Sequence, residues 1–421
     1  MTGMNEQTPE AKAAYDARWK RVMDCIELRQ PDRMPVGMFA TFWLAKYGGI
    51  SNRELMYDGE KAAAIATRAV LEFEPDIHSP FVLQTASGRV LDAAGYKQLQ
   101  WPGHGVGDNQ PYQYLDREYM TPDEYDEFEF DPTGFYLQKY LPRIGEAFEG
   151  LDEMPAFPGL HYFRLLGAMR NFARPRLRQA LENLIKVGEE ADRLALQQAA
   201  FTQNMTALGY PLSYLATSAA PYDLIADYFR GSTGMMKDLY RHKAKLHKML
   251  EKAQKFLTRM TIGAAKATGN PIVFIPIHWA PDAFMSEKQF REFWWPSFRQ
   301  MMIELIEAGV IPMPMWESDC TKRLEIIKDI PAGKCLYWFE RTDMVKACEV
   351  LGDVVALRGN MSPSLMTTGT AEQVDAAVKH LVDNVWNKGG KLILDTAFGI
   401  PDETPVENIR AMFAAARKYA G

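Results

Sequence analysis

The sequence predicts an α/β protein in which eight parallel strands close into a (β/α)8 barrel, the TIM-barrel fold. Short apolar runs of strand length alternate with helical patterns after residue 270, and three similar runs lie upstream. Such alternation is typical of parallel strands joined by crossover helices. The eight runs are residues 34–39, 75–80, 212–217, 272–277, 310–315, 335–339, 354–357 and 391–394. Eight strands close this barrel, so we expect one domain over residues 1–421.

Helix signals precede the first run and follow the later ones. Residues 8–29 form an amphipathic lead-in helix before the first strand. Helix starts are marked by Ser286 with Gln289, by Thr370 with Gln373, and by Thr404 with Pro405 and Glu407. The first two pairs are capping boxes, and the third combines an N-cap, a proline at the first helical position and an acid in the first turn.

Residues 84–160 interrupt this pattern and are rich in Gly, Pro, Tyr and acidic residues. An insertion after a barrel strand falls on the rim formed by the C-terminal strand ends. We therefore expect an insertion or lid over that rim, with a solvated surface excursion as the alternative.

Composition excludes several classes of function. The net charge of −6 and the pI near 5.8 argue against nucleic-acid and anionic-membrane partners. No run of about 18 apolar residues is present, and the N-terminus lacks the features of a signal peptide. The four cysteines have no paired spacing, which indicates reduced thiols and a cytoplasmic protein. A homodimer is the oligomeric form that we expect.

The densest polar cluster at a strand end is Glu317-Ser318-Asp319-Cys320. Two carboxylates at this spacing can share one pocket, and they can then bind a metal or act as a general acid and base. The structural alternative is that Asp319 caps the next helix while Glu317 pairs with an arginine.

Other polar and aromatic side chains stand near predicted strand ends. His278 follows the run 272–277 and suits a base, a metal ligand or a specificity group, with a structural histidine as the alternative. The remaining candidates are expected to bind substrate or to hold rim loops. They are Asp76, His78, Trp279, Trp316, Glu340 and Asn360.

Common catalytic motifs are absent from the sequence. It contains no GxGxxG after a strand and no GxxxxGK[ST], HExxH or GxSxG motif. Asp76-Ile77-His78 begins like the DxHxxG loop of corrinoid-binding modules, but Phe81 stands where the glycine is required. We therefore expect that the chain does not carry its own corrinoid.

Four segments carry a resemblance to a known family. They are residues 21–36, which contain Pro31-Asp32-Arg33, residues 221–231, residues 359–365 with Gly-Asn-Met-Ser-Pro, and residues 399–408. The chain resembles the uroporphyrinogen decarboxylase superfamily, which includes decarboxylases and corrinoid-dependent methyltransferases. The resemblance implies a TIM barrel and covers the chain apart from residues 84–160.

Two departures from the family pattern bear on function. Residues 38–43 are mostly apolar where true uroporphyrinogen decarboxylases carry an arginine-rich MRQAGRY segment, so that activity is not expected. The methyltransferase branch binds zinc through His-x-Cys and a later Cys, and these positions correspond to Glu317, Asp319 and Phe398 here. A thiol acceptor such as coenzyme M is therefore not expected, and an oxygen-rich metal site or an acid role remains.

The resemblance implies a methyltransferase related to that branch. It would take methyl from a small donor, such as a methoxylated aromatic ether or an ammonium or sulfonium compound. The acceptor would be cob(I)alamin on a separate corrinoid protein. We expect catalysis, and possible binding of a divalent metal such as zinc, at Glu317, Asp319 and His278. The alternatives are a corrinoid-free decarboxylase of a small acid, using Asp76 and Arg341, and a binding protein without catalysis.

Overall fold

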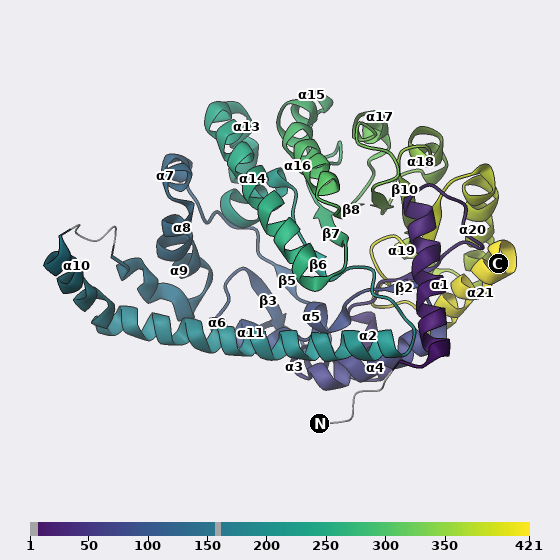
Figure 1. Cartoon of the computed structure of the whole chain (residues 1–421), viewed down its shortest axis with the longest axis horizontal. Helices are drawn as coiled ribbons and strands as arrows, with labels where there is room; N and C mark the ends of the chain where they lie inside the picture. Colours follow the sequence, from purple (N-terminus) through teal and green to yellow (C-terminus); the bar gives the residue numbers. More distant parts are fainter. Residues whose placement is uncertain (1–6, 156–160) are drawn as a thin grey trace.

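The computed structural model describes residues 7–155 and 161–421. Within these residues, eight short strands pair in parallel through the body of the molecule (Figure 1). Six form one sheet in the order β11-β10-β9-β8-β7-β6, and β1 and β2 form a separate pair. The strands are β1 (Gly37–Met38), β2 (Ile77–His78), β6 (Ala216–Thr217), β7 (Ile272–Ile277), β8 (Ile311–Trp316), β9 (Leu336–Phe339), β10 (Ala356–Met361) and β11 (Leu392–Thr396). The predicted α/β class with parallel strands is confirmed.

The two-stranded pair is linked to both edges of the six-stranded sheet. Val36, just before β1, forms a parallel bridge with Leu394 of β11. His78 of β2 forms a parallel bridge with Leu212, just before β6, and the Ser213 amide donates to the His78 carbonyl at 2.7 Å. All eight strands therefore belong to one continuous network of parallel pairing.

Two of the predicted strand ends were wrong. The predicted runs 354–357 and 391–394 place Asn360 and Asp395 beyond their strands, but both residues lie within the ladder, where they pair with each other in register. The cause is that β10 and β11 continue through polar residues to Met361 and Thr396. Apolar composition alone does not show where such a strand ends.

Helices follow most of the strands and cover the outside of the sheet (Figure 1). They include α4 (Gly59–Phe73), α14 (Lys243–Thr268), α16 (Trp295–Glu307), α18 (Met344–Leu351), α20 (Ala371–Asn384) and α21 (Val406–Ala420). Both predicted capping boxes, at Ser286 and at Thr370, are present. The third predicted start was displaced, because Pro405 is the N-cap of α21 and Thr404 is buried.

The interior between the strands is filled with aromatic side chains and one ion pair. Phe39, Tyr214, Phe274 and Trp338 contact one another with ring centroids 5.0 to 6.5 Å apart. The Arg358 guanidinium lies 4.0 Å from the ring centroid of Trp338 and donates to Asp395 at 2.7 and 2.9 Å. Both charged side chains are completely buried. The middle of the sheet is therefore a packed core, and space for a ligand must lie beyond it.

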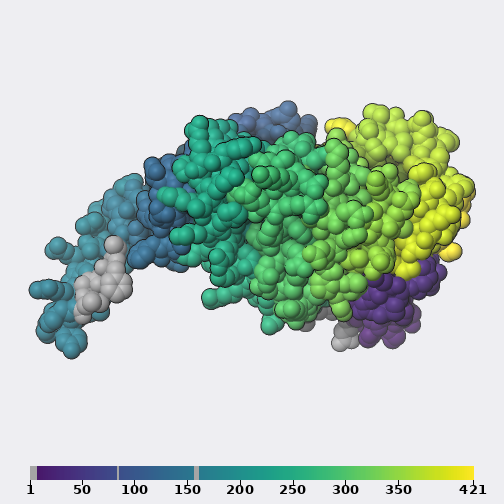
Figure 2. Space-filling model, turned by 90° about the horizontal axis from the view of Figure 1, so that it is seen from above, coloured from purple at the N-terminus to yellow at the C-terminus, as the bar shows by residue number. Residues whose placement is uncertain are grey.

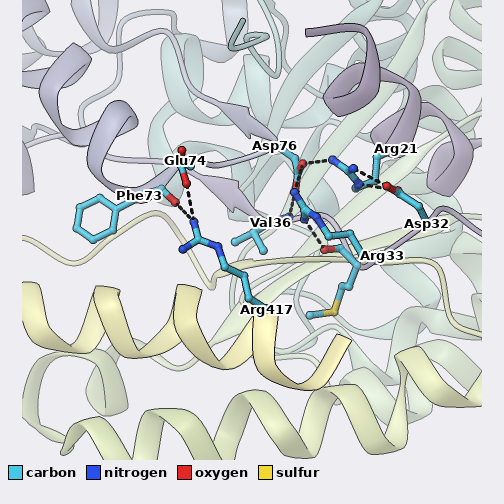
Figure 3. Close-up of polar contacts among 9 residues, drawn as sticks. Arg21, Asp32, Arg33, Val36, Phe73, Glu74, Asp76 and Arg417 are labelled. Atoms are coloured by element: carbon cyan, nitrogen blue, oxygen red, sulfur yellow. Dashed lines mark hydrogen bonds and ion pairs between the residues drawn. The ribbon is translucent and has the colours of Figure 1, made fainter. Parts of the chain in front are cut away.

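A buried charge network secures the N-terminal ends of the first strands (Figure 3). Asp76 accepts hydrogen bonds from Arg21 at 2.6 Å, from Arg33 at 2.8 and 2.9 Å, and from the Val36 amide at 2.9 Å. Arg21 lies on α1 (Pro9–Ile26), the predicted lead-in helix, and also binds Asp32. The carboxylate of Asp76 therefore fastens α1 and the Arg33 loop to the start of β2.

This position corrects the expectation for Asp76. It was predicted at the C-terminal end of its strand, but β2 consists of Ile77 and His78, so Asp76 precedes it. The carboxylate is completely buried and satisfied by two arginines. A role in substrate binding is not supported by this location.

The described residues of the 84–160 segment, 84–155, form two parts. The first part contains α6 (Gly88–Ala94) and the small sheet of β3 (Leu99–Pro102), β4 (Gly105–Val106) and β5 (Gln113–Tyr114). The second part contains α7 (Tyr125–Phe130), α8 (Pro132–Phe135) and α9 (Leu141–Ile144). This second part, together with α10 (Tyr162–Ala168) and the outer end of α11 (Pro175–Ala207), forms an arm projecting from the body (Figures 1 and 2). With its 33 residues, α11 extends about 50 Å and joins the arm to the body.

No helix within residues 7–155 and 161–421 is both long enough and apolar enough to cross a bilayer.

The network around Asp76 leads to a stability prediction. Asp76→Asn removes the negative charge that two buried or half-buried arginines share, and we expect a loss of roughly 3 kcal/mol in the free energy of unfolding. Urea denaturation measures this change. Asp32→Asn is the matched control, because Asp32 pairs with the same Arg21 but its side chain is 67% exposed. It should cost less than about 1 kcal/mol. Equal losses in the two variants would contradict the structural role of Asp76.

Candidate active site

A cavity of about 980 Å³ opens beyond the C-terminal ends of β6, β7 and β8. One wall comes from the strand ends and the helix after β6, which consists of α12 (Pro221–Leu224) and its continuation Ile225–Arg230. The opposite wall comes from the first part of the 84–160 segment. The lining residues are Ser87, Tyr96, Gln98, Leu99, Tyr112, Tyr114, Asp116, Thr217, Asp227, Tyr228, Ser232, His278, Trp279, Phe284 and Glu317. Six of them are aromatic, and the polar groups converge near His278.

His278 stands at the centre of the polar group, immediately after β7. Its Nδ1 lies 2.6 Å from Oδ2 of Asp227, and its Nε2 lies 3.3 Å from Oε1 of Glu317. Burial by itself lowers the pKa of His278, but the hydrogen bonds and charges of Asp227 and Glu317 outweigh it and raise the pKa to about 11. The imidazole is therefore a cation at neutral pH, with a carboxylate at each nitrogen.

Two aspartates on the helix after β6 hold this histidine in place. Asp227 also accepts a hydrogen bond from the Trp279 indole at 2.7 Å. Asp223 accepts from the His278 backbone amide and from the Trp294 indole, each at 2.7 Å. Burial and the nearby charge of Asp227 raise the pKa of Asp223 to about 7. Asp223 thus fixes the backbone of the loop after β7, and Asp227 fixes the side chains of His278 and Trp279.

Asp223 and Asp227 were not among the predicted site residues. Both follow the strand run 212–217, and a spacing of four places them on one face of a helix. Acidic residues at that spacing, directly after a strand, are a signal that a sequence search could have used.

The predicted pair Glu317 and Asp319 does not act as a pair. Glu317 faces the cavity, whereas Asp319 is exposed and its Oδ1 accepts from the Thr321 amide at 2.8 Å and the Thr321 hydroxyl at 2.6 Å. Asp319 therefore holds the turn that follows β8, which bears out the structural alternative in part. The other half of that alternative was wrong, because Glu317 pairs with His278 and not with an arginine.

The predicted metal set of Glu317, Asp319 and His278 is consequently not assembled. Both nitrogens of His278 are engaged by carboxylates, and Asp319 points to its own turn. In residues 7–155 and 161–421, no three His, Cys, Asp or Glu side chains are grouped so as to hold a metal ion. The residues present do not fit a resident zinc.

Two further candidates hold the loops of the rim. The Glu340 carboxylate accepts from the Ser318 amide at 2.5 Å, and the Asn360 amide donates to the Thr342 carbonyl at 2.8 Å. Ser318 has a positive φ of 58°, so this contact fixes the conformation of the loop that carries Glu317. Neither residue is among those that line the cavity, and both have polar groups committed to the backbone.

Of the remaining candidates, Trp279 lines the cavity, whereas His78 and Trp316 do not. Trp279 lines the cavity beside Phe284, with ring centroids 5.2 Å apart. His78 and Trp316 are completely buried in the core. Burial lowers the pKa of His78 to about 4, so it is neutral. The structure thus brings His278, Glu317 and Trp279 together and leaves His78 and Trp316 as packing residues.

Comparison with known proteins identifies the class to which this fold and site belong. Residues 171–419 match the uroporphyrinogen decarboxylase (URO-D) family, so the chain is a member of that family. The resemblance predicted from the sequence motifs is confirmed.

The relatives include enzymes of two kinds. The methylated-thiol–coenzyme M methyltransferase of Methanosarcina mazei is 24% identical over 232 residues, which cover 55% of this chain and 60% of the relative. A uroporphyrinogen decarboxylase of Coxiella burnetii is 22% identical over 267 residues, covering 58% of this chain and 71% of the relative. A solved structure of a methyltransferase from Methanosarcina mazei matches with a TM-score of 0.60 at 16% identity, over 96% of this chain and 98% of that one. At this identity, the structural match shows a shared fold.

The charge contacts of His278 lead to a prediction about its titration. Because its pKa is raised, the stabilisation that the imidazolium contributes is complete below the ordinary pKa of about 6.5 and is lost as the pH rises through about 11. Asp227→Asn removes the nearer carboxylate, so the pKa of His278 should fall by at least about one unit.

NMR titration of the imidazole signals measures this shift, with His278→Gln assigning the signal among the seven histidines. Asp126→Asn is the control, because Asp126 is paired with Lys245 at the surface. An unchanged His278 pKa in the Asp227→Asn protein would contradict the described contact.

Proposed function

We propose that this protein is the substrate-side methyltransferase of a two-protein system. It takes a methyl group from a small donor, either a methoxylated aromatic ether or a methylated ammonium or sulfonium compound. The acceptor is cob(I)alamin held by a separate corrinoid protein. The observation that carries the proposal is the aromatic cavity around His278, in a URO-D family member related to a methyltransferase.

The proposal includes a closed barrel. The bridges at Val36 and at His78 link both edges of the six-stranded sheet to the β1–β2 pair, which supports closure of the eight strands into one ring. The residues around the cavity then lie on the C-terminal rim, where enzymes with this fold carry their active sites. Residues 84–160 belong to the same domain, and residues 87–116 among them supply the facing wall.

The residues of this chain would bind and orient the donor. The aromatic walls exclude water and hold the methyl-bearing group, while Glu317 and the His278 imidazolium set the charge around it. Cob(I)alamin is a strong nucleophile and supplies the electron pair that attacks the methyl carbon. No step requires a metal ion bound by this chain.

The acceptor would approach from outside the cavity. A groove beside the cavity mouth is lined by Met236, Tyr240, Trp279 and Phe284 together with the cationic Lys237 and Arg241, and the Tyr240 side chain is exposed. Docking there would be weak and transient, because the corrinoid protein must leave to deliver its methyl group. Four free cysteines fit a reducing cytoplasm, where we place the reaction. A homodimer remains part of the proposal.

The alternative function is decarboxylation of a small acid, which the uroporphyrinogen decarboxylases among the relatives suggest. Such a substrate needs a cation for its carboxylate. Among the described lining residues the only cationic side chain is His278, and it is already paired with two carboxylates. Arg341, which we expected to handle charge, is exposed and lies 3.3 Å from Glu340. The cavity therefore favours methyl transfer.

The proposal predicts a strict requirement for a second protein. The purified chain should bind free cobalamin weakly and transfer methyl only when a corrinoid protein in the cob(I) state is added. Absorbance of the corrinoid follows the reaction, since the cob(I) and methylated forms differ in colour. Release of carbon dioxide from an added acid by the chain alone would contradict the proposal and support the lyase.

The two acidic residues should differ in their effects. Glu317→Gln should lower turnover by roughly 100-fold with little change in stability, because Glu317 faces the donor. Asp319→Ala removes only a cap, so it should cost about 1 kcal/mol in the free energy of unfolding and leave turnover within a few-fold. Steady-state kinetics and urea denaturation on both proteins measure these effects. A loss of turnover in the Asp319→Ala protein much greater than a few-fold would contradict the capping role and support the predicted acidic pair.

A further inference from the structure

The charge of the cavity lining is more negative than positive. Asp116, Asp227 and Glu317 contribute three carboxylates, and His278 contributes one imidazolium. Within the described lining, no lysine or arginine adds positive charge. A donor that carries its own positive charge would therefore enter a favourable potential, and a carboxylated donor would enter an unfavourable one.

The three carboxylates of the lining differ in how fully hydrogen bonds and ion pairs within the protein occupy their oxygen atoms. Asp227 is occupied by His278 and the Trp279 indole at 2.6 and 2.7 Å. Asp116 accepts from the Ser232 amide at 2.9 Å and from the Ser232 hydroxyl. Glu317 contacts His278 through one oxygen at the longer distance of 3.3 Å, and its side chain is 28% exposed. Glu317 is therefore the carboxylate best placed to face a cationic ligand.

Aromatic rings supply the rest of the wall. They are Tyr96, Tyr112, Tyr114, Tyr228, Trp279 and Phe284. The face of an aromatic ring carries partial negative charge and attracts methylated cations, and cages of several rings with a carboxylate suit quaternary ammonium groups. The Tyr114 hydroxyl donates to the Asp227 carbonyl, which turns that side chain toward the helix after β6 and fixes its ring in the wall.

The state of His278 is consistent with a cationic donor. When methyl leaves a neutral ether, negative charge develops on oxygen and must be neutralised by an acid. Both ring nitrogens of His278 already face carboxylates, and a developing phenolate would lie near Glu317 and Asp227. When methyl leaves an ammonium or sulfonium, the leaving group is a neutral amine or sulfide and needs no proton.

Together these features point to the substrate class. We propose that the methyl donor is a small onium compound, a quaternary ammonium or a tertiary sulfonium, bound between the aromatic wall and the Glu317 carboxylate. This inference rests on the proposed methyl transfer. In that reaction the bond from methyl carbon to nitrogen or sulfur breaks, and its electron pair stays on the leaving atom. The new bond to cobalt uses the electron pair of cobalt(I), which becomes cobalt(III).

The test compares two ligands of the same shape and different charge. Choline and 3,3-dimethylbutan-1-ol differ in one atom, the charged nitrogen or the neutral carbon at the branch. Calorimetric titration of the full chain should give a dissociation constant for choline at least 10-fold lower than for the neutral alcohol. Added salt should narrow this difference. Tetramethylammonium and trimethylsulfonium should also bind, and 4-methoxybenzoate should not.

Two variants locate the binding. Glu317→Gln should remove most of the preference for choline while leaving the affinity for the neutral alcohol unchanged, and Trp279→Leu should weaken both. Glu349→Gln is the matched control, because Glu349 is exposed on α18 and is not among the residues that line the cavity. Its preference should equal that of the native chain.

The outcomes separate this inference from the proposed function. Equal affinity for choline and its neutral isostere, or tighter binding of neutral 2-methoxyphenol, would overturn the onium assignment whatever the enzyme's activity. The preference for choline can be present while none of the onium compounds methylates an added cob(I) corrinoid protein. In that case the cavity is a binding site for cations, and the assignment of the onium compound as methyl donor is wrong. Transfer from 2-methoxyphenol alone would retain the methyltransferase and reject the onium donor.

Discussion

The contact on which the candidate site depends is the imidazolium of His278 held between Asp227 and Glu317. These residues come from three consecutive segments, the helix after β6, the end of β7 and the end of β8. Parallel pairing in register places the ends of β7 and β8 side by side, with Ile277 opposite Trp316. The charges therefore meet because the ladder brings their strands together, and the strong mutual attraction keeps the imidazole protonated in a half-buried place.

The three carboxylates around this contact, Asp223, Asp227 and Glu317, differ in burial and in the groups that they bind. Asp223 is completely buried and holds the backbone of the loop after β7. Asp227 orients the histidine and a tryptophan, and Glu317 meets the open cavity. Such an arrangement gives an exposed polar group a fixed position, because its neighbours are themselves locked by buried hydrogen bonds.

The two ends of the parallel sheet are used differently. At the N-terminal ends, Asp76 and its arginines form a closed network that fastens α1 to the strands. Between the ends, Arg358 and Asp395 are sealed beneath Trp338. Burying each charge carries a desolvation penalty, and the attraction between the charges offsets that penalty only when both partners are present. These pairs therefore constrain the relative positions of the strands. At the C-terminal ends the polar groups remain open to a cavity, to which residues 87–116 add three tyrosines of the aromatic wall.

The sequence by itself determined the α/β class, the positions of the strands to within a few residues, two helix starts and the URO-D family, and it singled out His278 and Glu317, which both line the cavity. These features are local, since apolar periodicity, capping residues and short motifs are visible within a few neighbouring positions. The tertiary structure decided which polar residues meet. In the structure Asp76 lies at the opposite end of the sheet from the predicted one, and His78 and Trp316 are buried. The tertiary structure also assigned Asp319 to a turn and brought in Asp223, Asp227 and the tyrosines of a segment more than 100 residues from His278. Those outcomes depend on strand register and on contacts between distant segments, and neither is encoded in the local pattern around any one residue.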